Sequence, residues 1–169
     1  MTSIPLTYDR FKHLFFVPAL IYLDRSKSGV LEVRKDKSAK FISCTALMYI
    51  DTGSTLTSIT DIEARTLQVD MSSLERELTG GIGGFSWVPC VENVNFVLQG
   101  DNSTARLFTL DRVGINHSKM TQKKVKGKGN RRLVTDNGEF VPLLGIDALK
   151  KMNAELVLNP TKETGELVC

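Results

Sequence analysis

The chain has 169 residues, which suits one domain with a hydrophobic core, and its 41% hydrophobic and 24% charged residues are typical of globular proteins. A net charge of +3 is too small to argue by itself for a nucleic-acid-binding protein. The most apolar run, Leu14 to Leu23, is shorter than the about 20 residues of a membrane-spanning helix and contains Pro18. Asp24 and Arg25 follow it in place of a signal-cleavage site, so we expect no membrane segment.

The three cysteines, Cys44, Cys90 and Cys169, are odd in number and lack the spacing of a metal site. They indicate free thiols in a reducing compartment, so we expect a soluble cytoplasmic protein without a metal or cofactor. We also expect a single domain over residues 1–169. Because the chain begins with Met, we expect a free-standing protein rather than a fragment of a polyprotein.

Aromatic and β-branched runs separated by turn residues predict a mainly β chain. In the first third, strands are expected over FFVPALIYL (15–23), VLEVRKD (30–36) and KFISCTALMYI (40–50), with SKSG (26–29) joining the first two as a hairpin. The segment 86–113 predicts two strands around a Gly-Asp-Asn turn, and ELVLNPTKETGELVC (155–169) predicts a terminal hairpin.

Helix signals are confined to two short segments. Thr60 and Glu63 form a capping box at the start of TDIEARTL (60–67), and DALKKM (147–152) predicts one or two turns after Gly145. The segment Lys119 to Arg132 has many cations, two glycines and little apolar content. It predicts a mobile basic insertion at about 117–137, for which a solvated surface is the commonest explanation.

The stretch ALMYIDTGSTLT (46–57) places an ionisable side chain at the end of an apolar strand. Asp51 follows the strand directly, and Gly53 lets the backbone approach a ligand because it has no Cβ atom. Thr52 and Ser54 supply hydroxyls that can hydrogen-bond carboxylates. A single Asp-Thr-Gly is usually only a turn, but this context favours a carboxylate fixed as a general base.

Three segments in order carry a resemblance to a known family. IDTGST resembles the catalytic loop of aspartic proteases, GGIGGF (80–85) resembles the glycine-rich flap of the retroviral-type enzymes, the retropepsins, and PLLGIDAL (142–149) resembles their apolar strand and helix. The resemblance covers roughly Ala46 to Pro160. It implies an all-β fold, a small closed β-barrel or sandwich with a flap hairpin and one or two short helices.

The resemblance also implies an aspartic endopeptidase, with Asp51, Thr52, Gly53 and Ser54 as its catalytic loop. Two carboxylates that share a proton activate water in this chemistry, and the chain has one Asp-Thr-Gly only, so a homodimer is expected to supply Asp51 twice. Thr52 would reach the partner's backbone, and Ser54 would hydrogen-bond its own Asp51. Asp147 is expected to be a poor second acid.

The same resemblance implies where a peptide or protein substrate binds. It would lie extended under the flap, against the apolar walls of the central pockets. The substrate-binding residues expected on this basis are Gly80, Gly81, Ile82, Gly83 and Gly84 in the flap, and Val141 and Leu143 in the walls. We therefore expect apolar or aromatic side chains on both sides of the cut.

One departure from the family concerns the dimer. The retroviral enzymes carry an Asp/Arg ion pair where this chain has Thr55 and Ile146, which puts their mode of dimerisation in doubt. A catalytically silent dimerisation or peptide-binding module is the main alternative. A nucleic-acid-associated protein ranks last, because no aromatic side chain is interleaved among the cations between Lys123 and Arg132.

Overall fold

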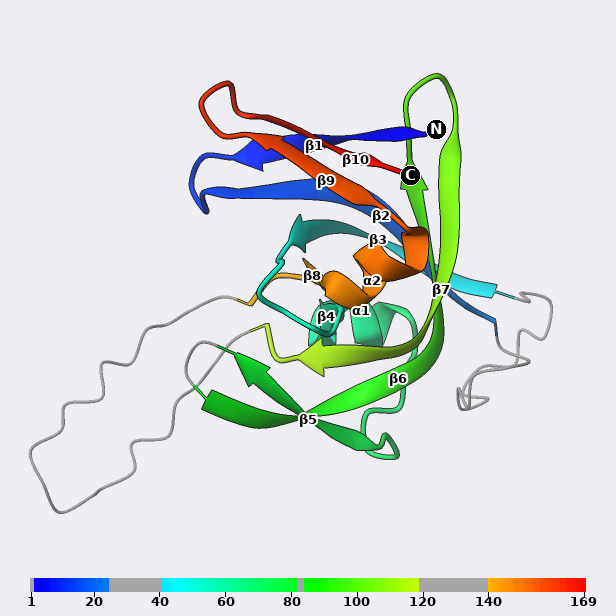
Figure 1. Ribbon diagram of the computed structural model, residues 1–169. Coiled ribbons are helices and arrows are strands. Elements are labelled where there is room, and N and C mark those ends of the chain that lie inside the picture. The colour runs from blue at the N-terminus through cyan, green and yellow to red at the C-terminus, as the bar shows by residue number, and fades with distance from the viewer. Residues whose placement is uncertain (1, 25–40, 82–83, 119–139) are drawn as a thin grey trace, which may run out of the picture.

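The computed structural model describes residues 2–24, 41–81, 84–118 and 140–169, with backbone alone for 80, 81 and 84–86 (Figure 1). Ten strands and two short helices occupy these parts: β1 Ser3–Asp9, β2 Leu14–Asp24, β3 Phe41–Ile50, β4 Ser58–Thr60, α1 Asp61–Thr66, β5 Arg76–Gly81, β6 Gly84–Gln99, β7 Ala105–Asn116, β8 Leu143–Leu144, α2 Ile146–Met152, β9 Glu155–Asn159 and β10 Thr164–Val168.

The strands form one sheet that closes on itself. Their order is β5-β6-β7-β4-β8-β3-β2-β1-β10-β9, and a further pairing joins β6 to β2. This pairing, from Ala19↔Leu98 to Leu23↔Val94, turns the middle strands into a closed ring. Closure leaves the two ends of the sheet outside the ring: β5 with the first part of β6 at one end, and the β1–β10–β9 layer at the other (Figure 1).

The side chains of β2 alternate between the core and the outside, while its backbone pairs with a neighbouring strand along each edge. Every second side chain of β2 is buried in the core, namely Phe15, Val17, Ala19, Ile21 and Leu23. Its backbone pairs with β3 along one edge and with β6 along the other. Phe96 and Phe108, stacked with ring centroids 5.3 Å apart, fill the core beside it.

Both helices begin where the sequence predicts. Thr60 caps α1, and the backbone N–H of Thr60 donates to Glu63 Oε2 at 2.9 Å, which completes the capping box. Gly145 precedes α2, which ends at Asn153 in the left-handed conformation. Ala148, Leu149 and Met152 bury one face of α2 in the core.

The all-β fold class predicted from the sequence is confirmed, and so are the two strands around residues 100–104 and the terminal hairpin β9–β10. β1 was not predicted. The expected strand 30–36 and its turn lie outside the described residues, as does the basic segment 119–132. In the described parts of the chain, neither helix has the length and apolar character needed to cross a membrane.

Candidate functional site

The carboxylate of Asp51 stands directly after β3, whose last residues, Met48 to Ile50, are buried. The N–H of Asp51 donates to the Leu144 carbonyl at 3.1 Å, which holds the strand end against β8. Within the loop, the N–H of Gly53 donates to Asp51 Oδ1 at 2.9 Å. The carboxylate is therefore oriented by its own loop while its side chain stays partly exposed to solvent.

Ser54 makes a different contact from the expected one. Its hydroxyl donates to the Leu56 carbonyl at 2.8 Å, so the expected bond from Ser54 to Asp51 is wrong for this structure. The reason is local, because the loop turns back at once and brings the Leu56 carbonyl within reach. Thr52 and Gly53, in the same loop, are exposed to solvent.

Hydrogen bonds form a bridge between the loop that follows Asp51 and the start of α2. The hydroxyl of the fully buried Thr57 donates to Asp147 Oδ1 at 2.6 Å, and the N–H of Thr57 donates to the same carboxylate at 2.9 Å. The Thr57 hydroxyl also accepts the N–H of Gly145 at 3.0 Å. A further backbone bond, 2.9 Å from Ile146 N–H to the Ser54 carbonyl, joins the same two segments.

The Asp147 carboxylate is thus engaged in this bridge, and its expected unsuitability as a second acid stays a prediction. Sequence reasoning did not find its partner Thr57, because the two residues are 90 positions apart and no motif links them. Thr57 lies six residues after Asp51, and its side chain looks like any turn-forming hydroxyl in the sequence.

A small recess lies beside the loop. It encloses about 60 Å³ and is lined by Ser54, Thr55, Leu56, Ser58, Thr79, Val88, Asn116 and Leu143. Leu143 lines this recess, whereas Val141 is half-buried and does not. This volume is well below the roughly 300 Å³ at which small-molecule pockets begin, so the recess has room for one small chemical group at most.

The glycine-rich segment forms the end of a β-hairpin over the recess. β5 and β6 pair from Arg76↔Pro89 to Gly81↔Gly84, and Thr79 and Val88 of this hairpin reach the recess wall. Gly80, Gly81 and Gly84 are therefore strand residues at its tip. Ile82 and Gly83 lie outside the described residues.

Tyr49, two residues before Asp51, connects β3 to Asp9 at the end of β1. Its hydroxyl donates to Asp9 Oδ2 at 2.7 Å. Burial, and then the bond to Asp9, raise the pKa of Tyr49 to about 12, whereas that bond holds the pKa of Asp9 below its ordinary value. Both shifts favour the pair as it stands at neutral pH, with a neutral phenol and an ionised carboxylate.

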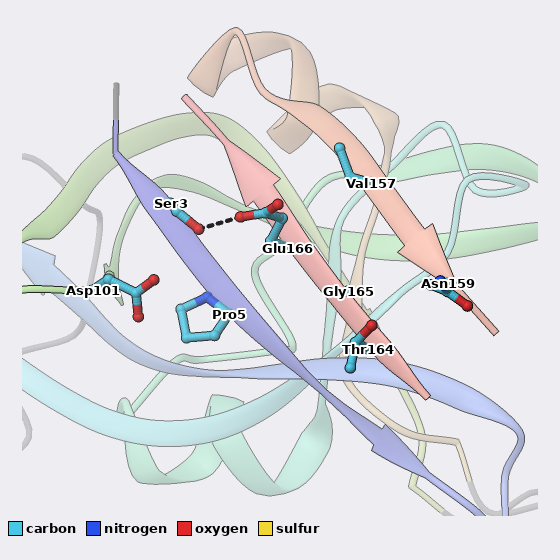
Figure 2. Close-up of a pocket in the computed structure, with 8 residues that line it drawn as sticks. All are labelled: Ser3, Pro5, Asp101, Val157, Asn159, Thr164, Gly165 and Glu166. Carbon is cyan, nitrogen blue, oxygen red and sulfur yellow. Dashed lines mark hydrogen bonds between the residues drawn. The ribbon is translucent and has the colours of Figure 1, made fainter. Parts of the chain in front are cut away.

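Two hollows lie away from Asp51. Figure 2 shows one of about 210 Å³ on the outer side of β1, β10 and β9, where the Ser3 hydroxyl donates to Glu166. The other, about 910 Å³, is open and shares Pro5 and Asp101 with the first. Over the described residues, no three metal-ligating side chains are gathered that could hold an ion.

Comparison with known proteins gives a match in fold only. No family model matches the chain, and no curated protein matches it either. Among solved structures, a retropepsin-like aspartic protease from Rickettsia conorii aligns over 98% of this chain and 88% of its own, with a TM-score of 0.51 and 12% identity. At that identity the likeness shows the fold alone: the chain has a fold similar to that of a retropepsin-like aspartic protease.

Proposed function

We propose that the protein is an aspartic endopeptidase whose active site takes one Asp51 from each of two identical chains. The observation that carries the proposal is the geometry of the Asp51 loop. Its carboxylate is partly exposed at the end of a buried strand and accepts the Gly53 N–H at 2.9 Å. The Thr57–Asp147 bridge fixes the loop to α2. The similarity in fold to an aspartic protease supports the same assignment.

The reaction needs two carboxylates in different protonation states. One ionised Asp51 takes a proton from water, which attacks the scissile carbonyl, while the protonated Asp51 of the other chain donates a hydrogen bond to the carbonyl oxygen. Two carboxylates in contact cannot both ionise, so they share one proton and titrate as a pair. No metal or cofactor takes part in this proposed reaction.

The second carboxylate is assigned to another chain because the nearby helices offer none that is available. Asp147 accepts three hydrogen bonds from Thr57 and Ala148 within the loop–α2 bridge. Asp61 on α1 is buried, pairs with Arg65 at 2.7 Å and accepts the Ser118 N–H. We assign to Thr52, which is exposed beside Asp51, the contact with the partner's loop, which is the role that the resemblance implies.

We assign the β5–β6 hairpin as the flap. A peptide substrate would lie extended between it and Asp51, with main-chain bonds to Gly80, Gly81 and Gly84 and to the adjoining Ile82 and Gly83. Leu143 supports this placement because it lines the recess between the catalytic loop and the hairpin base. Val141, half-buried two residues earlier, would contact the substrate farther along the cleft.

A catalytically silent peptide-binding or dimerisation module is the second candidate. The bond from Ser54 to Leu56 favours it, because it leaves Asp51 without the hydroxyl expected to support it. A cleavage assay separates the two candidates. Asp51→Asn should abolish hydrolysis of an unstructured peptide pool and leave the thermal unfolding midpoint unchanged, because the amide is nearly isosteric but cannot act as a base. Equal cleavage by the variant would contradict the role of Asp51.

A further inference from the structure

The recess beside the Asp51 loop is lined mainly by polar, uncharged side chains. Its apolar lining residues are Leu56, Val88 and Leu143, and the others carry a hydroxyl or an amide: Ser54, Thr55, Ser58, Thr79 and Asn116. Within the described residues, no ionisable side chain belongs to this lining. A charged guest would therefore lose its hydration without gaining a counter-charge, whereas a neutral polar guest would find hydrogen-bonding groups.

Ser58 and Asn116 form the buried polar part of the recess. Ser58, on β4, is only 5% exposed, and its backbone pairs with Gly114 of β7 and with Leu143 of β8. Asn116 ends β7, and its Nδ2 donates to Ser58 Oγ at 3.0 Å. The hydroxyl and the amide are thus fixed side by side on two neighbouring strands.

This hydrogen bond leaves the pair with one donor and one acceptor unused. The hydroxyl of Ser58 still has its proton to donate, and the amide of Asn116 still has its carbonyl oxygen to accept. Among the described residues, neither of these two atoms has another partner. Turning the amide over exchanges the two roles and again leaves one donor and one acceptor. The pair is therefore complementary to a guest group that both donates and accepts.

Gly114 keeps the recess open beside this pair. A Cβ atom at this position would lie 3.1 Å from Leu56 Cδ2, 3.2 Å from Val88 Cγ1 and 3.6 Å from Ser58 Cβ. All three side chains line the recess, so the missing side chain of Gly114 leaves space between them. The recess encloses about 60 Å³, which admits a hydroxyl or a primary amide on a short side chain but excludes an aromatic ring.

The recess lies where a substrate side chain next to the cut would enter it. Ser54 and Thr55 follow Asp51 by three and four residues and line one wall. Thr79 and Val88, on the β5–β6 hairpin, line another. A peptide held between the Asp51 loop and this hairpin would therefore place one of its side chains in the recess, close to the scissile bond.

We propose that the Ser58–Asn116 pair makes the recess a specificity subsite for Thr, Ser or Asn in a peptide substrate. This inference rests on the proposed endopeptidase and names a substrate class for it. It departs from the apolar or aromatic side chains expected beside the cut. An apolar guest of the same size would cover the Ser58 proton and the Asn116 carbonyl without bonding either of them, which costs binding free energy.

The test uses pairs of peptides that differ by Thr or its isostere Val at one position beside the cut. The ratio of kcat/KM between the two members is measured for the wild type, Ser58→Ala and Asn116→Leu. Thr109→Ala is the matched control, because Thr109 Oγ1 donates to Asn95 Oδ1 at 2.7 Å in a similar pair that does not line the recess.

The wild type should prefer Thr over Val by about tenfold at one position, since two hydrogen bonds form in a recess that is open to water. Ser58→Ala and Asn116→Leu should each bring the ratio below about threefold, because each removes one of these bonds. Thr109→Ala should keep the wild-type ratio. A variant that is only less stable slows the cleavage of both peptides alike and leaves their ratio unchanged.

Binding of the same peptides to Asp51→Asn chains, measured by fluorescence anisotropy, gives a second readout that needs no cleavage. A wild type that cleaves Val and Thr peptides equally, or a preference that survives in both recess variants, overturns the subsite and leaves the protease standing. If the wild type cleaves nothing but Asp51→Asn chains bind Thr peptides more tightly through Ser58 and Asn116, the protease falls and the subsite stands. Neither cleavage nor binding would overturn both.

Discussion

At the scale of one residue, Gly145 lies so close to the loop that follows Asp51 that no larger side chain fits there. A Cβ atom at this position would lie 2.8 Å from the carbonyl carbon of Leu56 and 2.9 Å from the nitrogen of Thr57. Both are backbone atoms of the loop that carries Asp51, so neither can move aside without shifting the loop. The glycine of the PLLGIDAL segment is therefore required by close approach rather than by a turn.

Gly145→Ala should lower the free energy of unfolding by about 1–3 kcal/mol and reduce cleavage more than stability alone explains, because it displaces Asp51. Gly165→Ala is the matched control, since its Cβ would meet the ends of the Leu158 and Phe15 side chains. Urea unfolding and peptide turnover, measured at a temperature where both variants are folded, separate the two effects. Full turnover in folded Gly145→Ala would show that the loop does not depend on this contact.

At the scale of elements, α1 is stabilised by a carboxylate that is sensitive to acid. Asp61 begins the helix, accepts the Ser118 N–H at 2.7 Å and pairs with Arg65. The bond from Ser118, above all, holds the pKa of Asp61 below its ordinary value of 3.8. The ionised form is thus favoured by folding, so the stabilisation is complete above the ordinary pKa and is lost as pH falls through the lowered one.

Asp61→Asn should therefore destabilise the protein by about 1.5–3 kcal/mol at pH 7, and the difference from the wild type should shrink below about pH 4. Urea midpoints at pH 7, 4 and 2.5 measure this difference, with the exposed carboxylate Asp111→Asn on β7 as the control. A difference that stays constant with pH would mean that the ionised carboxylate of Asp61 contributes nothing to the stability of α1.

Sequence patterns predicted elements whose signals are local. Aromatic and β-branched runs between turn residues predicted β2, β3, β6 and β7, and the pair of Thr60 and Glu63 located the start of α1. β1 was not predicted, because Pro5, which cannot donate a hydrogen bond to a neighbouring strand, interrupts its pattern. In addition, β1 pairs with β10 at the far end of the chain. Pairing between distant segments is decided by packing, which no short window of sequence contains.

The same difference between local and distant signals applies to the candidate site. The segment Asp51 to Ser54 and the glycine hairpin were visible because each is a continuous motif. The support of the loop by Asp147 was not, since its partner Thr57 lies 90 positions away in the sequence. The direction of the Ser54 hydroxyl was mispredicted because it depends on where one carbonyl, that of Leu56, lies.

At the scale of the whole molecule, the closed ring leaves one side carrying every feature that a dimer would use. The Asp51 loop and the tip of the β5–β6 hairpin lie on that side (Figure 1). Both are supported from within their own chain, by the Thr57–Asp147 bridge and by the β5–β6 ladder. This arrangement is consistent with the proposed site shared between two chains.

Mixing of subunits tests this two-chain site most directly. Wild-type chains are combined with Asp51→Asn chains in increasing proportion, exchanged to equilibrium, and assayed for peptide cleavage at constant wild-type concentration above the dimer dissociation constant. If both carboxylates are needed, mixed dimers are inactive, and an equal amount of variant should cut the activity to about half. Activity that does not change as Asp51→Asn chains are added would contradict a site shared between two chains.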